Sequence, residues 1–183
     1  MTEPTLVQQL AALAARPPAD LPDAVRSSAQ QRALDILGIC VRAATLDTSA
    51  AATRFAVAQG GRPDASAIGV TTRLPAPAAA FVNGVLAHSL DYDDTHLPSI
   101  LHPSASVVPA TLAAAQAAGT DGATTIAAAA VGIEIAVRLG MAGYDREAAA
   151  SVYFDRGQHA TSMCGAIGSA AAAAAVTKLD EDR

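Results

Sequence analysis

Long alanine-rich runs, broken at short intervals by glycine and proline, are the feature that most limits how this chain can fold. Alanine is the best helix former and adds little bulk, so such runs favour α-helices that pack closely together. The segments Gly-Gly-Arg-Pro at 60–63 and Gly-Thr-Asp-Gly at 119–122 are typical of helix ends and starts. Only residues 65–70 are predicted to be extended. The pattern predicts an all-α fold, with residues 1–183 forming a single multi-helix domain.

The spacing of apolar residues predicts the individual helices. The expected ranges are 5–15 (ended by Arg16-Pro17-Pro18), 20 or 22 to 44, 47–58, 78–90, 105–118 (capped by Ser104), 123–140, a short turn at 145–150, and 163–178. In the second helix the apolar positions cover so wide an arc that its second half is expected to be central. At least three helices are apolar on nearly every face. We therefore expect a homo-oligomer or a complex with another chain.

The charge distribution excludes one class of partner. The formal net charge is -5, and no lysine or arginine occurs between Arg73 and Arg138. A nucleic-acid-binding surface needs a cluster of such cations, so no nucleic-acid partner is expected.

Apolar segments and cysteines indicate the cellular setting. The N-terminus lacks the basic region and apolar core of a signal peptide. The most apolar segments, 126–139 and 163–176, are predicted to be buried helices, with no membrane association. Cys40 and Cys164 are far apart and lack metal-ligand spacing. We expect reduced thiols in a cytoplasmic protein.

Most residues able to do chemistry lie in one stretch, 81–102, with the sequence FVNGVLAHSLDYDDTHLPSILH. It contains three of the four histidines and three aspartates: His88, His96, His102, Asp91, Asp93 and Asp94. On a helix ending near Leu90, His88 and Asp91 would face the same side, and the carboxylate would fix the imidazole tautomer.

From the residues alone, three interpretations of this stretch remain open. It could be a solvated acidic loop whose aspartates cap helices. It could bind a divalent metal ion, although no HxxxH, HExxH or EF-hand spacing is present. It could also be a metal-free acid/base site. His102 suits that role, because the following Pro103 favours an extended backbone that projects the imidazole into a cavity.

The fourth histidine, His159, lies in the segment RGQHATS before the last predicted helix. It could be a capping or surface residue. Alternatively, Arg156 and the nearby helix N-terminus would form a positive corner that binds a carboxylate. A Cys164–His159 nucleophilic pair is conceivable, but a buried cysteine more often fills space in the core.

At these residues the sequence resembles the MmgE/PrpD family over essentially all of its length. The matching positions are Asn83-Gly84, HSLDYDDT at 88–95, His102-Pro103-Ser104, Gly132-Ile-Glu134, Arg138-Leu-Gly140 and RGQH at 156–159. The resemblance implies the family's helical domain without its lid domain, and a dimer. It also implies acid/base chemistry on small carboxylates without a metal or other cofactor, as in lyases (dehydratases and decarboxylases) and isomerases.

The resemblance also implies roles for individual residues. His102 is expected to transfer a proton, His159 to assist it, and Asp91 and Thr95 to orient the site. The expected substrate-binding residues are His88, Asp94, His96 and Arg156.

Two departures from the family pattern bear on function. Gln158 and Ala160 stand where the family usually has an aromatic residue and a proline or serine, which would reshape the pocket. Family members are also much longer, and their remaining part carries a lysine-containing motif. A carboxylate substrate needs cations that the central stretch does not provide.

We therefore expect a lyase or isomerase subunit whose site is completed by a separate C-terminal-half subunit. One alternative is a self-sufficient homodimer with altered chemistry on a less charged substrate. Another is a non-catalytic binding or regulatory subunit.

Overall fold

The computed structural model describes residues 3–15 and 21–180. These residues form eight α-helices, one 3₁₀ turn and a short hairpin. The elements are α1 (Leu6–Ala14), α2 (Asp23–Ala43), α3 (Asp47–Gln59), α4 (Ala76–His88), η2 (Leu97–Ser99), α5 (Pro103–Ala118), α6 (Gly122–Ala142), β1 (Tyr144–Asp145), β2 (Ala150–Ser151), α7 (Val152–Asp155) and α8 (Ala160–Thr177). The prediction of an all-α fold is confirmed.

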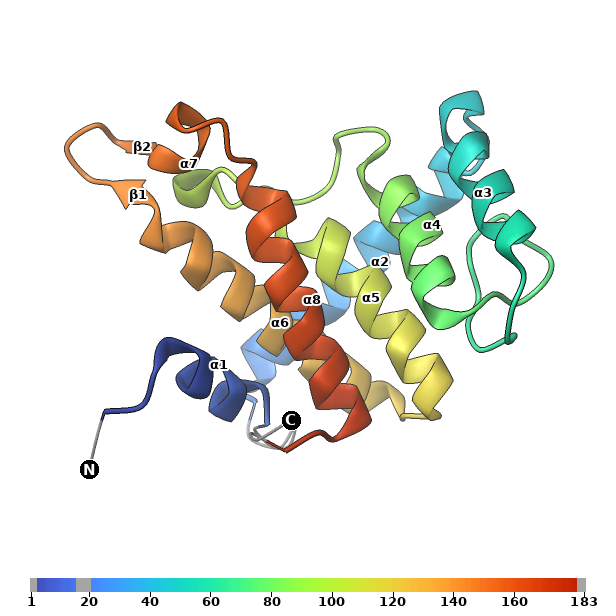
Figure 1. Ribbon diagram of the computed structural model, residues 1–183, viewed down its shortest axis with the longest axis horizontal. Coiled ribbons are helices and arrows are strands. Elements are labelled where there is room, and N and C mark those ends of the chain that lie inside the picture. Colours follow the sequence, from blue (N-terminus) through green and yellow to red (C-terminus); the bar gives the residue numbers. More distant parts are fainter. Residues whose placement is uncertain (1–2, 16–20, 181–183) are drawn as a thin grey trace.

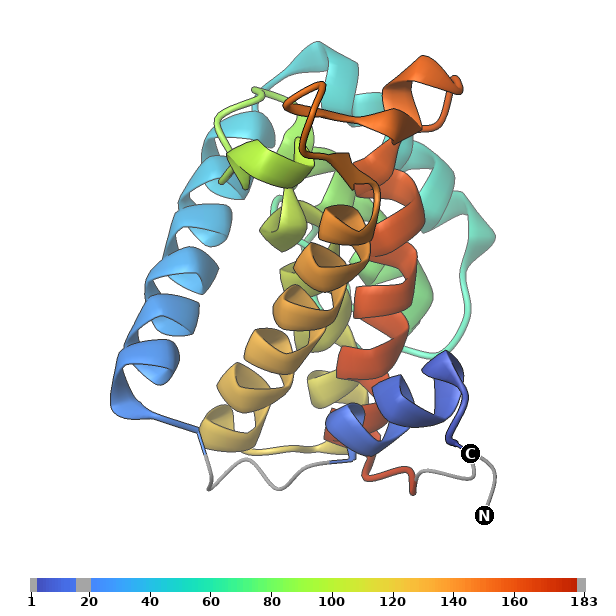
Figure 2. The same ribbon diagram turned by 90° about the vertical axis from the view of Figure 1, so that its left-hand side faces the viewer.

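Three helices, α5, α6 and α8, form the centre of the bundle. Helix α8 packs against both α5 and α6, and α4 covers the other side of α5 (Figure 1). Helix α2 runs along one flank and α1 lies across the lower end of α6 and α8 (Figure 2). The helices come this close because their buried residues are mostly alanine, valine and glycine.

Glycines allow α6 and α8 to touch backbone to backbone. A Cβ atom on Gly132 of α6 would lie 2.6 Å from the carbonyl oxygen of Gly168 in α8. One on Gly168 would lie 2.5 Å from the carbonyl oxygen of Gly132. A Cβ atom on Gly165 of α8 would likewise collide with the side chain of Ser106 in α5. These contacts fix how α5, α6 and α8 are placed relative to one another.

Helices α6 and α8 are also long and apolar enough to cross a membrane, judged by length and composition alone. This is weak evidence, because core helices of soluble proteins satisfy the same criteria. The two helices pack against each other in the bundle, as expected for buried helices.

Two short segments differ from the predictions. Residues 65–70 form no strand, and Ala65 makes only an isolated bridge to Leu74. Residues 145–150 form the β1–β2 hairpin rather than a helical turn. The reason is local: the Asp145 carboxylate accepts hydrogen bonds from the backbone N–H groups of Glu147 (2.8 Å) and Ala148 (3.1 Å), which stabilises a turn.

The boundaries of several helices also shift. Helix α4 ends at His88, two residues before the predicted end, and α5 begins at Pro103 without a side-chain cap from Ser104. Thr5 is the N-cap residue of α1, and Asp121, in the predicted turn, is the N-cap residue of α6. The predicted starts of these two helices are therefore confirmed. The predicted stop at Arg16-Pro17-Pro18 and the possible start at residue 20 lie outside the described residues.

The prediction that the second half of α2 is central is correct for only one face of the helix. Leu34 and Val41 are 72% and 62% exposed, while Ile36 and Cys40 on the opposite face are buried. The wide apolar arc thus has one side in the core and the other on the surface of the described chain.

The contact between α6 and α8 generates a stability prediction. Gly132→Ala would drive its new methyl group into the backbone of α8 and into the Val107 side chain. Overpacking of this kind costs about 1–3 kcal/mol, so the free energy of unfolding measured in urea should fall by that amount.

Gly38→Ala is the matched control, because a Cβ at this exposed position of α2 meets nothing within 4 Å. It should leave stability unchanged or raise it by about 0.5–1 kcal/mol. Equal effects of the two substitutions would contradict the close contact.

Candidate active site

The loop between α4 and α5 carries the candidate site and is held at its C-terminal end. Its last residue, His102, precedes Pro103 at the start of α5. The backbone N–H of His102 donates a 3.0 Å hydrogen bond to Thr161 Oγ1 in the first turn of α8. An isolated bridge pairs His96 with Leu101 inside the loop. The site therefore lies where the N-terminal ends of two packed helices meet.

Asp93 is the centre of this site. Its side chain is 0% exposed. Its carboxylate oxygens lie 3.0 and 3.1 Å from His88 Nδ1, and Oδ2 lies 3.4 Å from His102 Nδ1. The two imidazole rings meet edge to face, with their centroids 4.9 Å apart. One buried carboxylate thus orients both rings.

Hydrogen-bond partners fix the tautomer of His102. Its Nδ1 lies 3.3 Å from the backbone carbonyl oxygen of Asp93, and a carbonyl oxygen can only accept. Nδ1 therefore carries the proton, and the lone pair of the neutral ring is on Nε2. Thr95 Oγ1 lies 3.4 Å from Nδ1, and Asp91 Oδ1 lies 3.8 Å from Nε2.

The hydrogen bonds of His159 place its ring proton on the other nitrogen. It is the N-cap residue of α8, and its Nδ1 accepts a 3.2 Å hydrogen bond from the backbone N–H of Ser162. The lone pair of the neutral ring is therefore on Nδ1 and the proton is on Nε2. His159 therefore caps α8, as one of its two interpretations from the sequence proposed. Its exposed ring still carries an N–H donor at Nε2.

Asp94 points to different partners. Its carboxylate forms an ion pair with Arg32 of α2 and accepts hydrogen bonds from the backbone N–H (3.2 Å) and hydroxyl (2.8 Å) of Ser104. It therefore caps α5 from outside the helix and ties that helix to α2. Its predicted role in substrate binding stays a prediction.

The remaining predicted residues lie apart from Asp93. His96 Nδ1 lies 2.7 Å from Ser99 Oγ. Arg156 follows α7 with an exposed side chain. Asp91, Thr95, His88 and His102 are brought together, whereas Asp94 and His96 have other partners.

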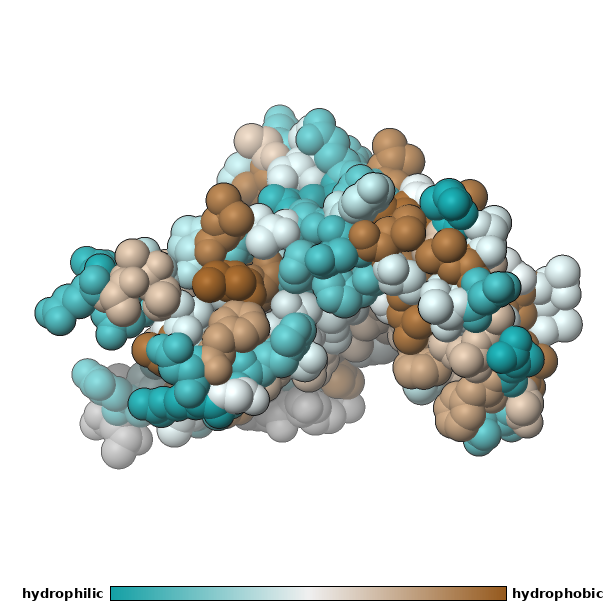
Figure 3. All heavy atoms as spheres, turned by 90° about the horizontal axis from the view of Figure 1, so that it is seen from above, coloured by the Kyte–Doolittle hydropathy of each residue, from teal (hydrophilic) through white to brown (hydrophobic). Residues whose placement is uncertain are grey.

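The face above these loops is mixed in character. Hydrophilic residues gather over its middle, with hydrophobic patches on either side (Figure 3). The side chains of His88 and Asp91 are 42% and 78% exposed, so the cluster is open to solvent in the described chain.

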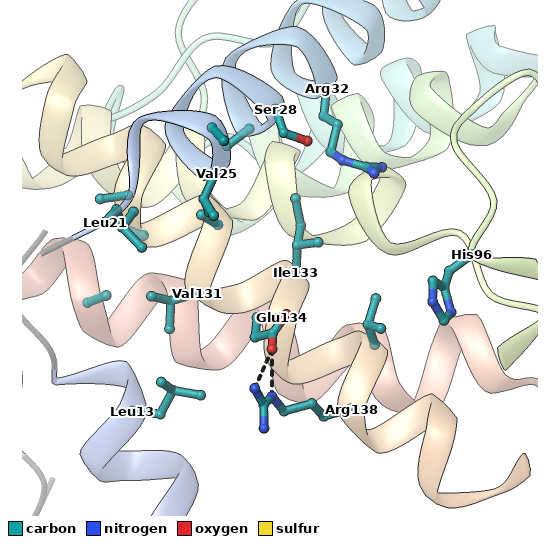
Figure 4. A pocket seen from close by; sticks show the side chains of 17 residues that line it. Leu13, Leu21, Val25, Ser28, Arg32, His96, Val131, Ile133, Glu134 and Arg138 are labelled. Carbon is teal, nitrogen blue, oxygen red and sulfur yellow. Dashed lines mark hydrogen bonds and ion pairs between the residues drawn. The ribbon is translucent and has the colours of Figure 1, made fainter. Parts of the chain in front are cut away.

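A large groove of about 690 Å³ lies elsewhere, among α1, α2 and α6. Apolar side chains such as Leu21, Val25 and Ile133 line it, with Arg32 and His96 towards one end (Figure 4). Its acidic residue Glu134 is paired with Arg138. We place the site at the His–Asp cluster, because the groove lacks paired groups that could exchange a proton.

The sequence placed Asp93 in the acidic stretch but gave it no role in the site. The helical spacing of His88 and Asp91 pointed to the wrong partner, because α4 ends at His88 and Asp91 adopts a left-handed backbone with φ of 54°. The usable signal was weak: Asp93 is one of three aspartates within four positions, and nothing in the sequence sets it apart from Asp91 and Asp94.

The comparison with protein families decides the identity of the domain. The model of the MmgE/PrpD N-terminal domain matches residues 8–183. The chain belongs to the MmgE/PrpD family. Relatives include the cis-aconitate decarboxylases of Mus musculus and Homo sapiens. The mouse enzyme is 40% identical over 117 residues, which cover 62% of this chain and 21% of the mouse protein. The human enzyme is 34% identical over 158 residues, 84% of this chain and 32% of the human protein.

The match to these MmgE/PrpD relatives thus spans about a fifth to a third of their length. It includes the helical region that carries the His–Asp cluster.

The link between Asp94, Arg32 and Ser104 generates a second prediction. Asp94→Asn would remove the ion pair and weaken both hydrogen bonds at the start of α5. The free energy of unfolding should fall by about 1–3 kcal/mol, measured by urea denaturation. Asp35→Asn, on the exposed face of α2, is the control and should change it by less than about 0.5 kcal/mol. A neutral Asp94→Asn variant would show that this link does not hold α5.

The two thiols generate a third prediction. Burial raises the pKa of Cys40 to about 11 and also raises the pKa of Cys164. Both cysteines are buried, so their thiols stay protonated and inaccessible at neutral pH. A thiol reagent such as Ellman's should react with both only after unfolding. Rapid reaction of Cys164 in the native protein would instead revive a nucleophilic role beside His159.

Proposed function

We propose that this domain supplies the proton-transfer part of a lyase or isomerase site that acts on a small carboxylate substrate without a cofactor. The observation that carries the proposal is the set of hydrogen-bond partners of two histidines at the starts of two packed helices, because these partners call for ring protons on opposite nitrogens. His102 presents a lone pair on Nε2 and His159 presents an N–H. One ring can thus accept a proton while the other donates a hydrogen bond or a proton.

His102 suits the role of general base. Asp93 and its carbonyl oxygen hold the Nδ1 proton, which leaves Nε2 free to accept a proton from an acidic C–H bond. The buried Asp93 carboxylate would also stabilise the imidazolium that forms. Thr95 and Asp91 lie on either side of the ring and would limit its rotation.

The helix ends suit a carboxylate substrate. The positive ends of the α5 and α8 dipoles meet at the site, since His102 and His159 are the N-cap residues of these helices. His159 Nε2–H and the exposed Arg156 guanidinium would add donors at the start of α8.

The same groups support more than one reaction. In a decarboxylation the bond to the leaving carboxylate breaks, CO2 departs, and the electron pair left on carbon takes a proton from a protonated imidazole. In a dehydration or isomerisation the neutral His102 ring first removes a proton from carbon. Because two relatives are cis-aconitate decarboxylases, cis-aconitate is the first substrate to test.

Charge balance implies a further contributor to the site. Asp91 and Asp93 bring two carboxylates, and within the described residues their ion pairs are with imidazoles. Arg32 is already paired with Asp94. A substrate with two or three carboxylates would be left without enough cations, at several kcal/mol for each unpaired charge. We propose that a separate C-terminal-half subunit supplies those cations and covers the site, with further self-association through exposed apolar residues.

The proton-transfer role is tested by substitution in the assembled enzyme purified from its native source. His102→Gln should lower kcat by about 10²–10⁴ with a smaller change in KM, because it removes the base. His159→Gln should mainly raise KM if the ring binds a carboxylate. Product formation and CO2 release from cis-aconitate are the measurements.

Asp35→Asn on the outer face of α2 is the control for both variants and should keep the parent kcat and KM. Unchanged turnover in His102→Gln would refute the role of this ring. Mass spectrometry of the native assembly tests the second subunit: this chain alone, fully active on a tricarboxylate, would contradict it.

A further inference from the structure

The geometry points to a second use of the same cluster: we propose that His88, His102 and Asp91, with the buried Asp93 carboxylate behind the two rings, form a binding site for a divalent first-row transition metal ion such as Zn²⁺ or Co²⁺. One imidazole nitrogen or carboxylate oxygen from each of the four side chains lies within 4.8 Å of all the others. Two imidazoles with carboxylates are a donor set that such ions prefer, whereas Mg²⁺ and Ca²⁺ favour oxygen ligands alone.

The separations between donors fit one shared ion. Metal–nitrogen and metal–oxygen bonds of about 2.0–2.2 Å place neighbouring donors about 3–3.5 Å apart and opposite donors about 4.2 Å apart. His102 Nε2 lies 3.8 Å from Asp91 Oδ1, and each of the four side chains has one donor atom within 4.8 Å of those of the others. Only small side-chain movements would bring the donors onto an ion.

Asp93 already prepares the imidazoles for this role. Its buried carboxylate bonds to His88 Nδ1 and faces His102 Nδ1 from the same side. In metal sites a ligating histidine commonly donates its other N–H to a carboxylate, which fixes the ring and makes the ligating nitrogen more basic. The Nε2 atom of His102, next to Asp91, is then the free ligand.

Charge also favours a cation here. With neutral imidazoles the four side chains carry two negative charges, and the ion pairs of Asp91 and Asp93 in the described part of the chain are with these imidazoles alone. A divalent ion would neutralise the cluster. It would also occupy the His102 lone pair, so metal binding and the proposed proton transfer exclude each other.

Binding is tested directly on this chain, so the result does not depend on the proposed function. The tag-free protein is freed of metal with a chelator, then titrated with Zn²⁺ by calorimetry and with Co²⁺ by visible absorption. One ion per chain is expected, with a d–d spectrum typical of nitrogen and oxygen ligands. A Kd weaker than about 1 mM for both ions would overturn the proposal.

Variants locate the ion. His88→Ala and Asp91→Asn should each weaken binding about tenfold or more, and should reduce the Co²⁺ absorption. Asp91→Asn keeps the test valid if the histidine variant misfolds, because this side chain is 78% exposed and asparagine tolerates the left-handed backbone. His96→Ala is the matched control and should bind as the parent does, since His96 bonds to Ser99 outside the cluster. Equal binding by parent, His88→Ala and Asp91→Asn, or loss of binding in His96→Ala, would overturn the assignment.

Discussion

The close approach of α6 and α8 is the constraint on which the rest of the structure depends. Gly132 and Gly168 let the two backbones touch, and Gly165 lets α8 approach α5. Larger residues at these positions would push the helices apart. The starts of α5 and α8 would then separate, and the hydrogen bond from His102 to Thr161 joins these starts. Packing in the middle of the bundle therefore sets the geometry at its end.

At that end, one buried carboxylate organises the chemistry. Asp93 holds two imidazoles by their Nδ1 atoms, and this directs the lone pair of His102 away from the protein interior. Burying a carboxylate is costly unless it is hydrogen-bonded, and here His88 Nδ1 bonds to it while His102 Nδ1 lies 3.4 Å away. The arrangement suits a base that takes a proton from a substrate. It suits a ligand that binds a metal ion equally well, because both uses need the same lone pair.

The helices were predictable because each rests on a local signal. Alanine-rich runs form them, and residues such as Thr5 and Asp121 cap them. The general position of the site was also predictable, since most histidines and a cluster of aspartates share one stretch. The partner of each of these side chains could not be predicted from the sequence. Asp91, Asp93 and Asp94 have the same side chain, and only the path of the loop after His88 decides that Asp91 and Asp93 face the imidazoles while Asp94 faces Arg32 and Ser104.

The prediction that the second half of α2 is central failed on one face of the helix for a related reason. Apolar residues around a whole helix indicate that the helix has no strongly polar face, but they do not say which neighbour covers each side. Leu34 and Val41 face away from the described bundle, although their chemistry matches that of the buried Ile36. Contacts between segments distant in sequence decide such cases, and spacing along one helix cannot reveal them.

The proposed chemistry requires His102 and His159 to hold their protons on opposite ring nitrogens. Nitrogen-15 NMR of the histidine side chains in the uniformly labelled chain measures this directly at a pH where both rings are neutral. We expect the Nδ1–H tautomer for His102 and the Nε2–H tautomer for His159. The same tautomer in both rings, or an Nε2–H proton on His102, would contradict it.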